Sequence, residues 1–235
     1  FTGASADLWQ HLAMQVPPTP SPTPTALVLR ASGLQAALPA GSDLFHLPAL
    51  TITPGITLVR GDEGVGKTTL LRLLAGERPQ QVTQAQLAGH DLHAAPDAYR
   101  AEVAWLDPSR AAWDCMVVND LWAQQARNFR RWSADTLEDL TDALDLQAHR
   151  HKPLTMLSTG SRRKALLAAA LSSGAALTLL DMPFAALDGA ASRTLREVLT
   201  DCATHPSRAF VLADYAAPTG VPLAQVIDLD ARAAD

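Results

Sequence analysis

A glycine-rich turn constrains this chain more than any other feature. Residues 61–69 read GDEGVGKTT and match the pattern GxxxxGK[ST]. Residues 55–60 (GITLVR), just before the turn, have the composition of a buried strand. Residues 67–75 (KTTLLRLLA) have helical spacing and stop at Gly76. A strand, a flexible turn and a helix in this order present backbone N–H groups to an anion, so the sequence predicts a phosphate-binding P-loop.

The residue types in the turn indicate which ligands to expect. Lys67 is predicted to reach the β and γ phosphates of ATP, and the Thr68 hydroxyl to help hold Mg²⁺. Glycines let the backbone follow the phosphates closely. The predicted nucleotide contacts in the turn are Gly61, Gly64, Gly66, Lys67, Thr68 and Thr69.

A second motif lies further along the chain. Residues 176–181 (ALTLLD) read as an apolar strand that ends in a carboxylate, and residues 182–188 (MPFAALD) follow it. In this layout, known as Walker B, Asp181 is predicted to hold the Mg²⁺ through water, together with Thr68. A buried strand that ends in an ordinary turn is the plain alternative.

A third segment, residues 157–161 (LSTGS), begins a predicted helix upstream of Asp181. A serine followed by a glycine at a helix start presents a hydroxyl and free N–H groups, which favour an anion. Taken alone, the segment is explained better as an ordinary N-cap.

In this order and spacing, the three motifs resemble the ATP-binding cassette of ABC transporters, over about residues 26–229. The resemblance implies a head-to-tail dimer, homomeric or heteromeric, that clamps ATP between two subunits. Ser158 and Gly160 of the signature segment (residues 157–161) then contact the partner's nucleotide, and Asp188 lies in the D-loop.

The resemblance also implies a membrane-spanning transporter subunit on a separate chain. The helical subdomain, together with the segment around Asp107, is the part that meets the coupling helix of that subunit. Trp105, Trp113 and Trp122 are candidates for the same face, although core packing is the simpler explanation for each of them. The expected location is cytoplasmic, peripheral to the inner face of the cell membrane.

The predicted fold class is α/β: a P-loop NTPase core with a mainly parallel sheet, an N-terminal antiparallel β piece and an α-helical subdomain at about residues 107–161. Residues 1–25 are predicted to be an extension with a proline-rich linker, before a nucleotide-binding domain over residues 26–235. Strands are expected at 26–30, 50–53, 55–60, 103–106, 177–180, 209–213 and 226–229. Helices are expected at 67–75, twice within 117–145 with Ser133 or Asp135 capping the second, at 161–172 and at 190–202.

Three positions that the resembled family uses for hydrolysis carry other residues here. Met182 stands where the family has a glutamate, Asp107 where it has the Q-loop glutamine, and Tyr215 where it has the switch histidine. Methionine cannot accept a proton. The aromatic side chain that stacks on adenine aligns loosely with residues 36–37, with Phe45 or His46 as substitutes.

Two functional readings therefore stay open. In one, the chain is a slow ABC-type ATPase, because phosphoryl transfer depends mostly on positioning and charge, and Asp107 orients the water. In the other, it is a hydrolysis-deficient, nucleotide-gated regulatory protein or the degenerate half of a heterodimer. We expect residual activity.

Composition excludes several other classes. A formal net charge of −5 gives no reason to expect a nucleic-acid partner. The cysteines, Cys115 and Cys202, lack metal-ligand or disulfide-framework spacing. The most apolar stretch, residues 165–180, is shorter than the ~20 residues of a membrane span. His90 and His93 are expected in an exposed loop rather than in a metal site.

Overall fold

Two sheets organise the computed structural model, which describes residues 27–37 and 43–230. The predicted extension and linker (residues 1–25) lie outside the described residues. The larger sheet is parallel, with strand order β6-β7-β8-β3-β9. Its strands are β3 (Gly55–Arg60), β6 (Val103–Trp105), β7 (Leu177–Asp181), β8 (Ala209–Asp214) and β9 (Gln225–Asp228). The predicted parallel core is confirmed.

The central strands β3, β7 and β8 are apolar and buried on both faces, as expected for a parallel sheet that is covered twice. Their side chains alternate between two core clusters. In β8, Phe210 and Leu212 pack with the helical layer, whereas Val211 packs with the opposite side. The sheet therefore separates two hydrophobic cores.

The second sheet is antiparallel, with order β2-β1-β4-β5. Its strands are β1 (Leu29–Ala37), β2 (Asp43–Ile52), β4 (Val82–Leu87) and β5 (His90–Asp91). The predicted strands at 26–30 and 50–53 are too short, since β1 and β2 form a long hairpin. β4 and β5 were not predicted from the sequence. The prediction that His90 lies in a loop is wrong, because His90 pairs with Leu87.

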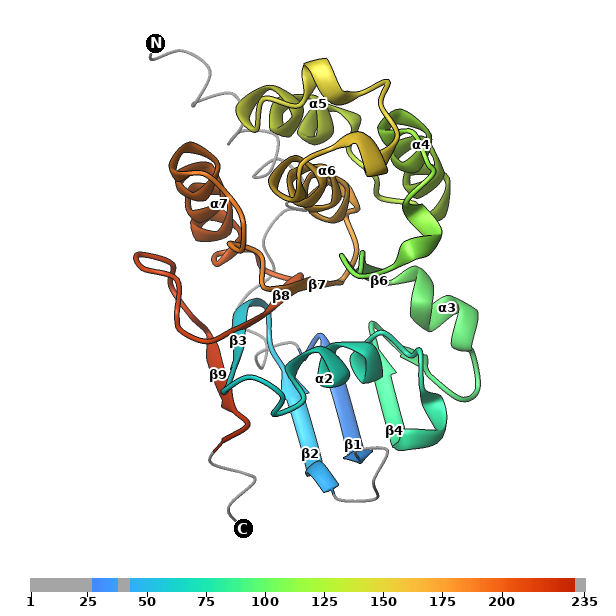
Figure 1. The fold of residues 1–235 in the computed structure, drawn as a ribbon. Helices are drawn as coiled ribbons and strands as arrows, with labels where there is room; N and C mark the ends of the chain where they lie inside the picture. The colour runs from blue at the N-terminus through green and yellow to red at the C-terminus, as the bar shows by residue number, and fades with distance from the viewer. Residues whose placement is uncertain (1–26, 38–42, 231–235) are drawn as a thin grey trace.

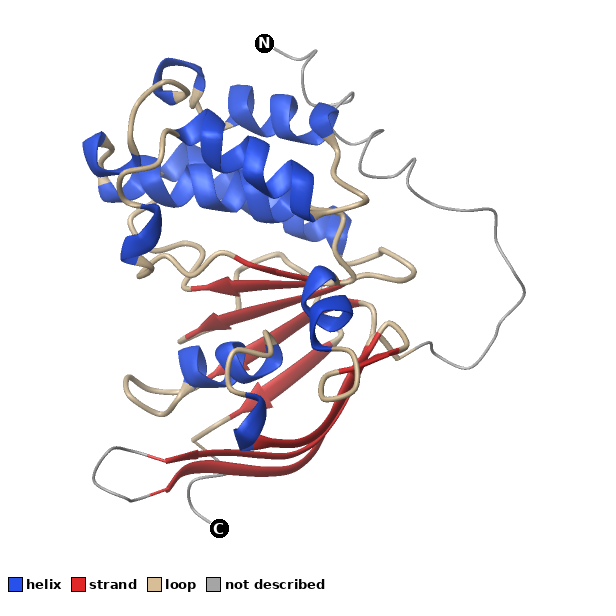
Figure 2. Cartoon of the chain, turned by 90° about the vertical axis from the view of Figure 1, so that its right-hand side faces the viewer, coloured by secondary structure: helices blue, strands red, loops and turns tan. Residues whose placement is uncertain are grey.

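The helices form two layers (Figures 1 and 2). α4 (Val118–Asn128), α5 (Ala134–Ala143), α6 (Thr159–Ser172) and α7 (Gly189–Cys202) lie over one face of the parallel sheet. α2 (Lys67–Leu74) lies between the two sheets, and α3 (Pro96–Ala101) follows β5. Short 3₁₀ turns occur at Pro79–Gln81, Ala111–Trp113, Gln147–His149 and Leu154–Met156.

The helix boundaries follow their caps. Ser133, one of the two predicted caps of α5, accepts a hydrogen bond from the Thr136 N–H at 3.1 Å. α6 is buried along its second half, from Ala165 to Ser172, as a central helix requires. In the described part of the chain, no helix combines the length and apolar character needed to cross a membrane.

This architecture places two of the three motifs. The P-loop follows the carboxyl end of β3, and the Met182 segment follows the carboxyl end of β7. Both strands lie in one parallel sheet with β8 between them, so their carboxyl ends meet at one edge. That edge is where open α/β sheets bind ligands.

Candidate functional site

The P-loop connects β3 to α2 as predicted. Gly61 and Gly64 adopt positive φ values of 154° and 80°. Gly66, at φ 104°, has a second constraint, because a Cβ atom there would lie 2.8 Å from the Phe45 ring. Phe45 is 3% exposed, so it supports the loop from behind rather than offering a free face for adenine. The other candidate, His46, is exposed.

Lys67, the first residue of α2, is buried against its own loop. Its Nζ donates to the carbonyl oxygens of Gly61 (2.5 Å) and Asp62 (2.7 Å). The same Nζ lies 4.3 Å from the centroid of the Tyr215 ring. Tyr215 therefore reaches the P-loop from the end of β8, and it contacts the lysine that is predicted to bind phosphate.

Thr68 and Asp181 come together as the sequence predicted. Thr68 Oγ1 donates to Asp181 Oδ2 at 2.7 Å. Burial raises the pKa of Asp181 above its ordinary value, the charge of Asp107 acts in the same direction, and the hydrogen bond from Thr68 opposes them. Asp181 Oδ1 is buried without a hydrogen-bond partner among the described residues.

These two oxygen ligands fit Mg²⁺. A hydroxyl and a carboxylate are hard oxygen donors, which Mg²⁺ prefers, and the ion usually completes its shell with waters and substrate phosphates. A cation beside Asp181 would neutralise the buried carboxylate. The described residues therefore supply two protein ligands that suit such a site. Thr69 is half-buried in the same turn of the helix.

Asp107, which the sequence assigns to the Q-loop position, lies just after β6. Its Oδ1 accepts hydrogen bonds from the Ser109 N–H (2.8 Å) and hydroxyl (2.6 Å), and its Oδ2 accepts one from Arg72 Nη2 (2.8 Å). Burial works against ionisation, but these hydrogen bonds outweigh it and lower the pKa of Asp107. The carboxylate is thus charged and already engaged, so a role in orienting water stays a prediction.

Met182 directly follows Asp181 with a left-handed backbone, φ 47°. Its N–H donates to the Ala213 carbonyl at 2.9 Å. Arg163 of α6 donates from Nη1 to the carbonyls of Asp181 (2.8 Å) and Met182 (2.6 Å). The backbone of this segment is therefore fixed on both sides by neighbouring elements.

The signature segment begins α6. Ser158 is the N-cap, and its side-chain hydrogen bonds within the described residues go to Ser161, whose N–H lies 3.1 Å away. A Cβ at Gly160 would lie 2.5 Å from the Ala186 carbonyl oxygen, so only glycine lets α6 approach the D-loop this closely. Ser158 is exposed and free to meet a second molecule.

Asp188 closes the D-loop as the N-cap of α7. It accepts from the Ala191 N–H at 2.8 Å and pairs with Lys164 Nζ at 2.7 Å. These hydrogen bonds, first from Ala191 and then from Lys164, lower the pKa of Asp188 to about 2. The Lys164 contact links the D-loop to α6.

Arg72 and Arg163 are site residues that were not predicted from the sequence. Arg72 lies one helical turn after Thr68, and this i, i+4 spacing places both on one face of α2, a signal that was available. Arg163 had no such signal, because its partners are backbone carbonyls of β7 and of the segment after it, which only the packing of α6 brings near.

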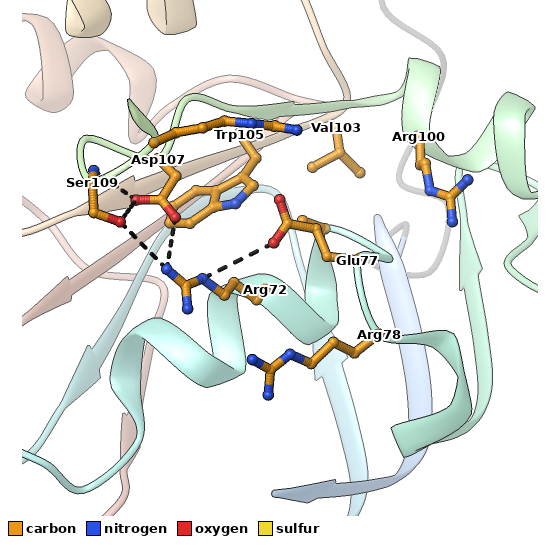
Figure 3. A pocket seen from close by; sticks show the side chains of 10 residues that line it. Arg72, Glu77, Arg78, Arg100, Val103, Trp105, Asp107 and Ser109 are labelled. Carbon is orange, nitrogen blue, oxygen red and sulfur yellow. Dashed lines mark hydrogen bonds and ion pairs between the residues drawn. The ribbon is translucent and has the colours of Figure 1, made fainter. Parts of the chain in front are cut away.

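A cavity of about 710 Å³ opens beside Asp107 (Figure 3). Arg72 reaches across it toward Asp107, Ser109 and Glu77. Its described lining contains four arginines and two carboxylates: Arg72, Arg78, Arg100, Arg110, Glu77 and Asp107. A neighbouring cavity of about 580 Å³ shares Arg100, Trp105 and Arg110 and adds the apolar side chains of Trp113, Met116 and Phe129.

Comparisons with known proteins identify the family of this chain. A family model described as ABC transporter matches residues 48–185. An uncharacterized ABC transporter ATP-binding protein of Haemophilus influenzae is 34% identical over 163 residues, which are 67% of this chain and 64% of that protein. The cytochrome c biogenesis ATP-binding export protein CcmA of Hyphomonas neptunium is 35% identical over 179 residues, 75% of this chain and 84% of its own.

Solved structures resemble the fold. A structure titled as the ATP-binding subunit of an ABC transporter superposes with a TM-score of 0.66 at 18% identity, covering 79% of each chain. A putative ABC transporter ATP-binding protein from Pyrococcus furiosus also gives 0.66, at 17% identity, over 87% of this chain and 98% of that one.

Proposed function

Because this chain belongs to the ABC transporter family of ATP-binding proteins, we propose that it binds MgATP at the P-loop and uses that binding to drive a membrane partner. One observation carries the proposal: the 2.7 Å hydrogen bond that joins Thr68 to Asp181, beside the buried Lys67. The predicted magnesium ligands and the lysine that is predicted to bind phosphate thus lie at one edge of the parallel sheet, which supports the proposal.

Calorimetric titration with MgATP tests this site. Lys67→Ala should weaken binding at least about tenfold, because it removes a charged contact with the phosphates. Arg30→Ala is the matched control: it removes the same charge from an exposed position on β1. Equal affinities of the Lys67 variant and the unaltered chain would contradict the assignment.

We propose that hydrolysis is slow. The carboxylate that would activate water is absent at Met182, and general-base catalysis is worth about 10²–10⁴-fold. A second candidate, a nucleotide-gated switch without hydrolysis, is favoured by Arg72 and Ser109, which occupy both oxygens of Asp107. Phosphate release under single-turnover conditions separates the two.

We further propose that ATP closes a head-to-tail dimer in which the exposed Ser158 and the N-terminus of α6 meet the partner's nucleotide. Light scattering should then show MgATP-dependent dimers. Ser158→Glu should abolish them by charge repulsion while leaving ATP affinity of the monomer unchanged. Monomers at saturating MgATP would count against a homodimer and leave a heterodimer to test.

The arginine-lined cavity in Figure 3 supports a docking site for the membrane subunit, at the inner face of the membrane. Its excess of arginines favours an acidic helix, and the adjoining Trp113, Met116 and Phe129 provide an apolar floor. The combined Arg100→Glu and Arg110→Glu variant should lower co-purification with the membrane subunit at least about tenfold. Arg193→Glu, on the exposed face of α7, is the control, and equal recovery from both would contradict the site.

A further inference from the structure

A separate cavity of about 640 Å³ lies at the opposite edge of the parallel sheet from the P-loop. Its lining comes from the loops that precede β7 and β8, from the α4–α5 connection and from Ala88 between β4 and β5. The described lining residues that matter here are Arg131, Trp132, Ala176, His205, Ser207 and Arg208. Because the nucleotide residues follow the carboxyl ends of the strands, this amino-end cavity is distinct from the nucleotide site.

Arg208 carries a buried charge in this cavity. It is 6% exposed, and its Nε donates to the Ala175 carbonyl at 2.9 Å. Its Nη2 has no hydrogen-bond partner, and no carboxylate pairs with it, among the residues that the structure describes. Burial lowers the pKa of Arg208. The guanidinium lies 5.0 Å from the centroid of the Phe210 ring, but this contact supplies no counter-ion, so the site favours an anion.

His205 adds a second donor. Its Nδ1 accepts hydrogen bonds from the N–H groups of Ser207 (3.2 Å) and Arg208 (3.1 Å). The proton of the neutral ring is therefore on Nε2, which is buried and has no partner in the described part of the chain. Burial, then the charges of Arg208 and Arg131, lower the pKa of His205 to about 4, so the ring is neutral at physiological pH.

The remaining lining residues indicate the chemical nature of the other part of a bound ligand. Arg131 donates to the Gly174 carbonyl at 2.7 Å and pairs with Glu102, so its charge is balanced, unlike that of Arg208. Trp132 provides a planar apolar surface next to these donors. The volume lies within the range of about 300–1,000 Å³ that small-molecule pockets occupy.

We propose that this cavity binds a small organic anion, with its carboxylate or phosphate held by Arg208 and His205 and its aromatic or apolar body against Trp132. A guanidinium group and an imidazole N–H recognise an anionic group, and an indole ring recognises an aromatic or apolar body. The proposal does not depend on the assigned nucleotide site.

Calorimetric titration of the full chain tests the ligand class, with saturating MgATP present so that the P-loop is filled. The probes are benzoate and phenyl phosphate, with benzyl alcohol as the neutral analogue and inorganic phosphate as the anion without a ring. We expect benzoate or phenyl phosphate to bind at least about tenfold more tightly than either control. The tighter of the two identifies the anionic group. Absence of aryl-anion binding, or equal binding of either control, overturns the proposal.

A size-matched pair of variants, of which only one adds a charge, tests the location of the site. Ser207 is exposed at the cavity wall. Ser207→Asp should weaken aryl-anion binding at least about tenfold by repulsion, whereas Ser207→Asn, of the same size without the charge, should leave it unchanged. Both should keep the MgATP affinity of the unaltered chain, which shows that they fold. Aryl-anion binding that is unaffected by Ser207→Asp overturns the assignment to this cavity.

Discussion

The two halves of the nucleotide site differ in what their side chains already contact. In the phosphate-binding half, Lys67 lies on its own loop and Thr68 bonds to Asp181, so the lysine and the two proposed magnesium ligands converge. In the hydrolytic half, Met182 has no polar group, and Asp107 is engaged by Arg72 and Ser109.

This difference indicates that nucleotide binding and hydrolysis depend on different parts of the structure. Phosphate binding uses backbone N–H groups and the helix terminus, which β3 and α2 fix together. Turnover depends on single side chains after the strand ends, and these can change without disturbing the sheet. A chain can therefore keep the first and lose the second.

The largest effect is expected when a carboxylate is restored at position 182. Met182→Glu should raise the rate of single-turnover phosphate release by about 10²–10⁴-fold, which is the range that general-base catalysis contributes. Met182→Gln is the neutral control and should give no comparable gain. Unchanged release and affinity in the glutamate variant would mean that residue 182 does not face the nucleotide.

The glutamate variant has a second informative outcome. Asp181 already has a raised pKa, caused by burial and by the charge of Asp107. A third carboxylate in this region would add repulsion toward the phosphates. Weaker MgATP binding without faster release would indicate that Asp107 already performs the catalytic role.

Asp107→Asn should lower the free energy of unfolding by about 1–2 kcal/mol near pH 7, because it breaks the pair with Arg72. The folded-state pKa of Asp107 is below its ordinary value, so its stabilising contribution is present above that value and is lost as pH falls through the folded pKa. Denaturant unfolding should show a constant difference between about pH 5 and 8 and a smaller one below about pH 4. A difference that grew in acid would contradict the ion pair.

Tyr215→Ala should have the smallest effect. A cation–π contact at an exposed site is worth about 0.5–1 kcal/mol, and here it competes with phosphate for Lys67. Removing the ring should tighten MgATP binding by about two- to fivefold. Tyr215→Phe keeps the ring and should match the unaltered chain. If the phenylalanine variant bound more weakly, the hydroxyl, rather than the ring, would be the group that meets the nucleotide.

Patterns of apolar residues predicted the elements that hold the site. β3 and β7 were visible as uninterrupted buried runs, and α2 as a helix fixed at its start by the P-loop. β4 was not, because residues 82–87 (VTQAQL) alternate imperfectly and contain three polar side chains. That strand is held by its pairing with β1, which no local pattern records.

The identities of the site residues were easier to predict than their partners. Thr68 and Asp181 are 113 positions apart, yet the motifs in which they lie predicted their contact. The contacts of Asp107 with Arg72, and of Lys67 with Tyr215, depend on how the chain packs around the P-loop. The burial of Phe45 behind Gly66 is likewise a product of the β1–β2 hairpin, so its candidacy for stacking on adenine could not be judged from sequence.

The hydrogen bonds from Arg163 to two successive carbonyls affect which substitutions this site can accept during evolution. The guanidinium and the Ala213 carbonyl hold the peptide around residue 182, whatever side chain that residue carries. Substitution at this position therefore leaves the backbone trace in place. A catalytic group can be lost there, and regained by one replacement, without rebuilding the strand end.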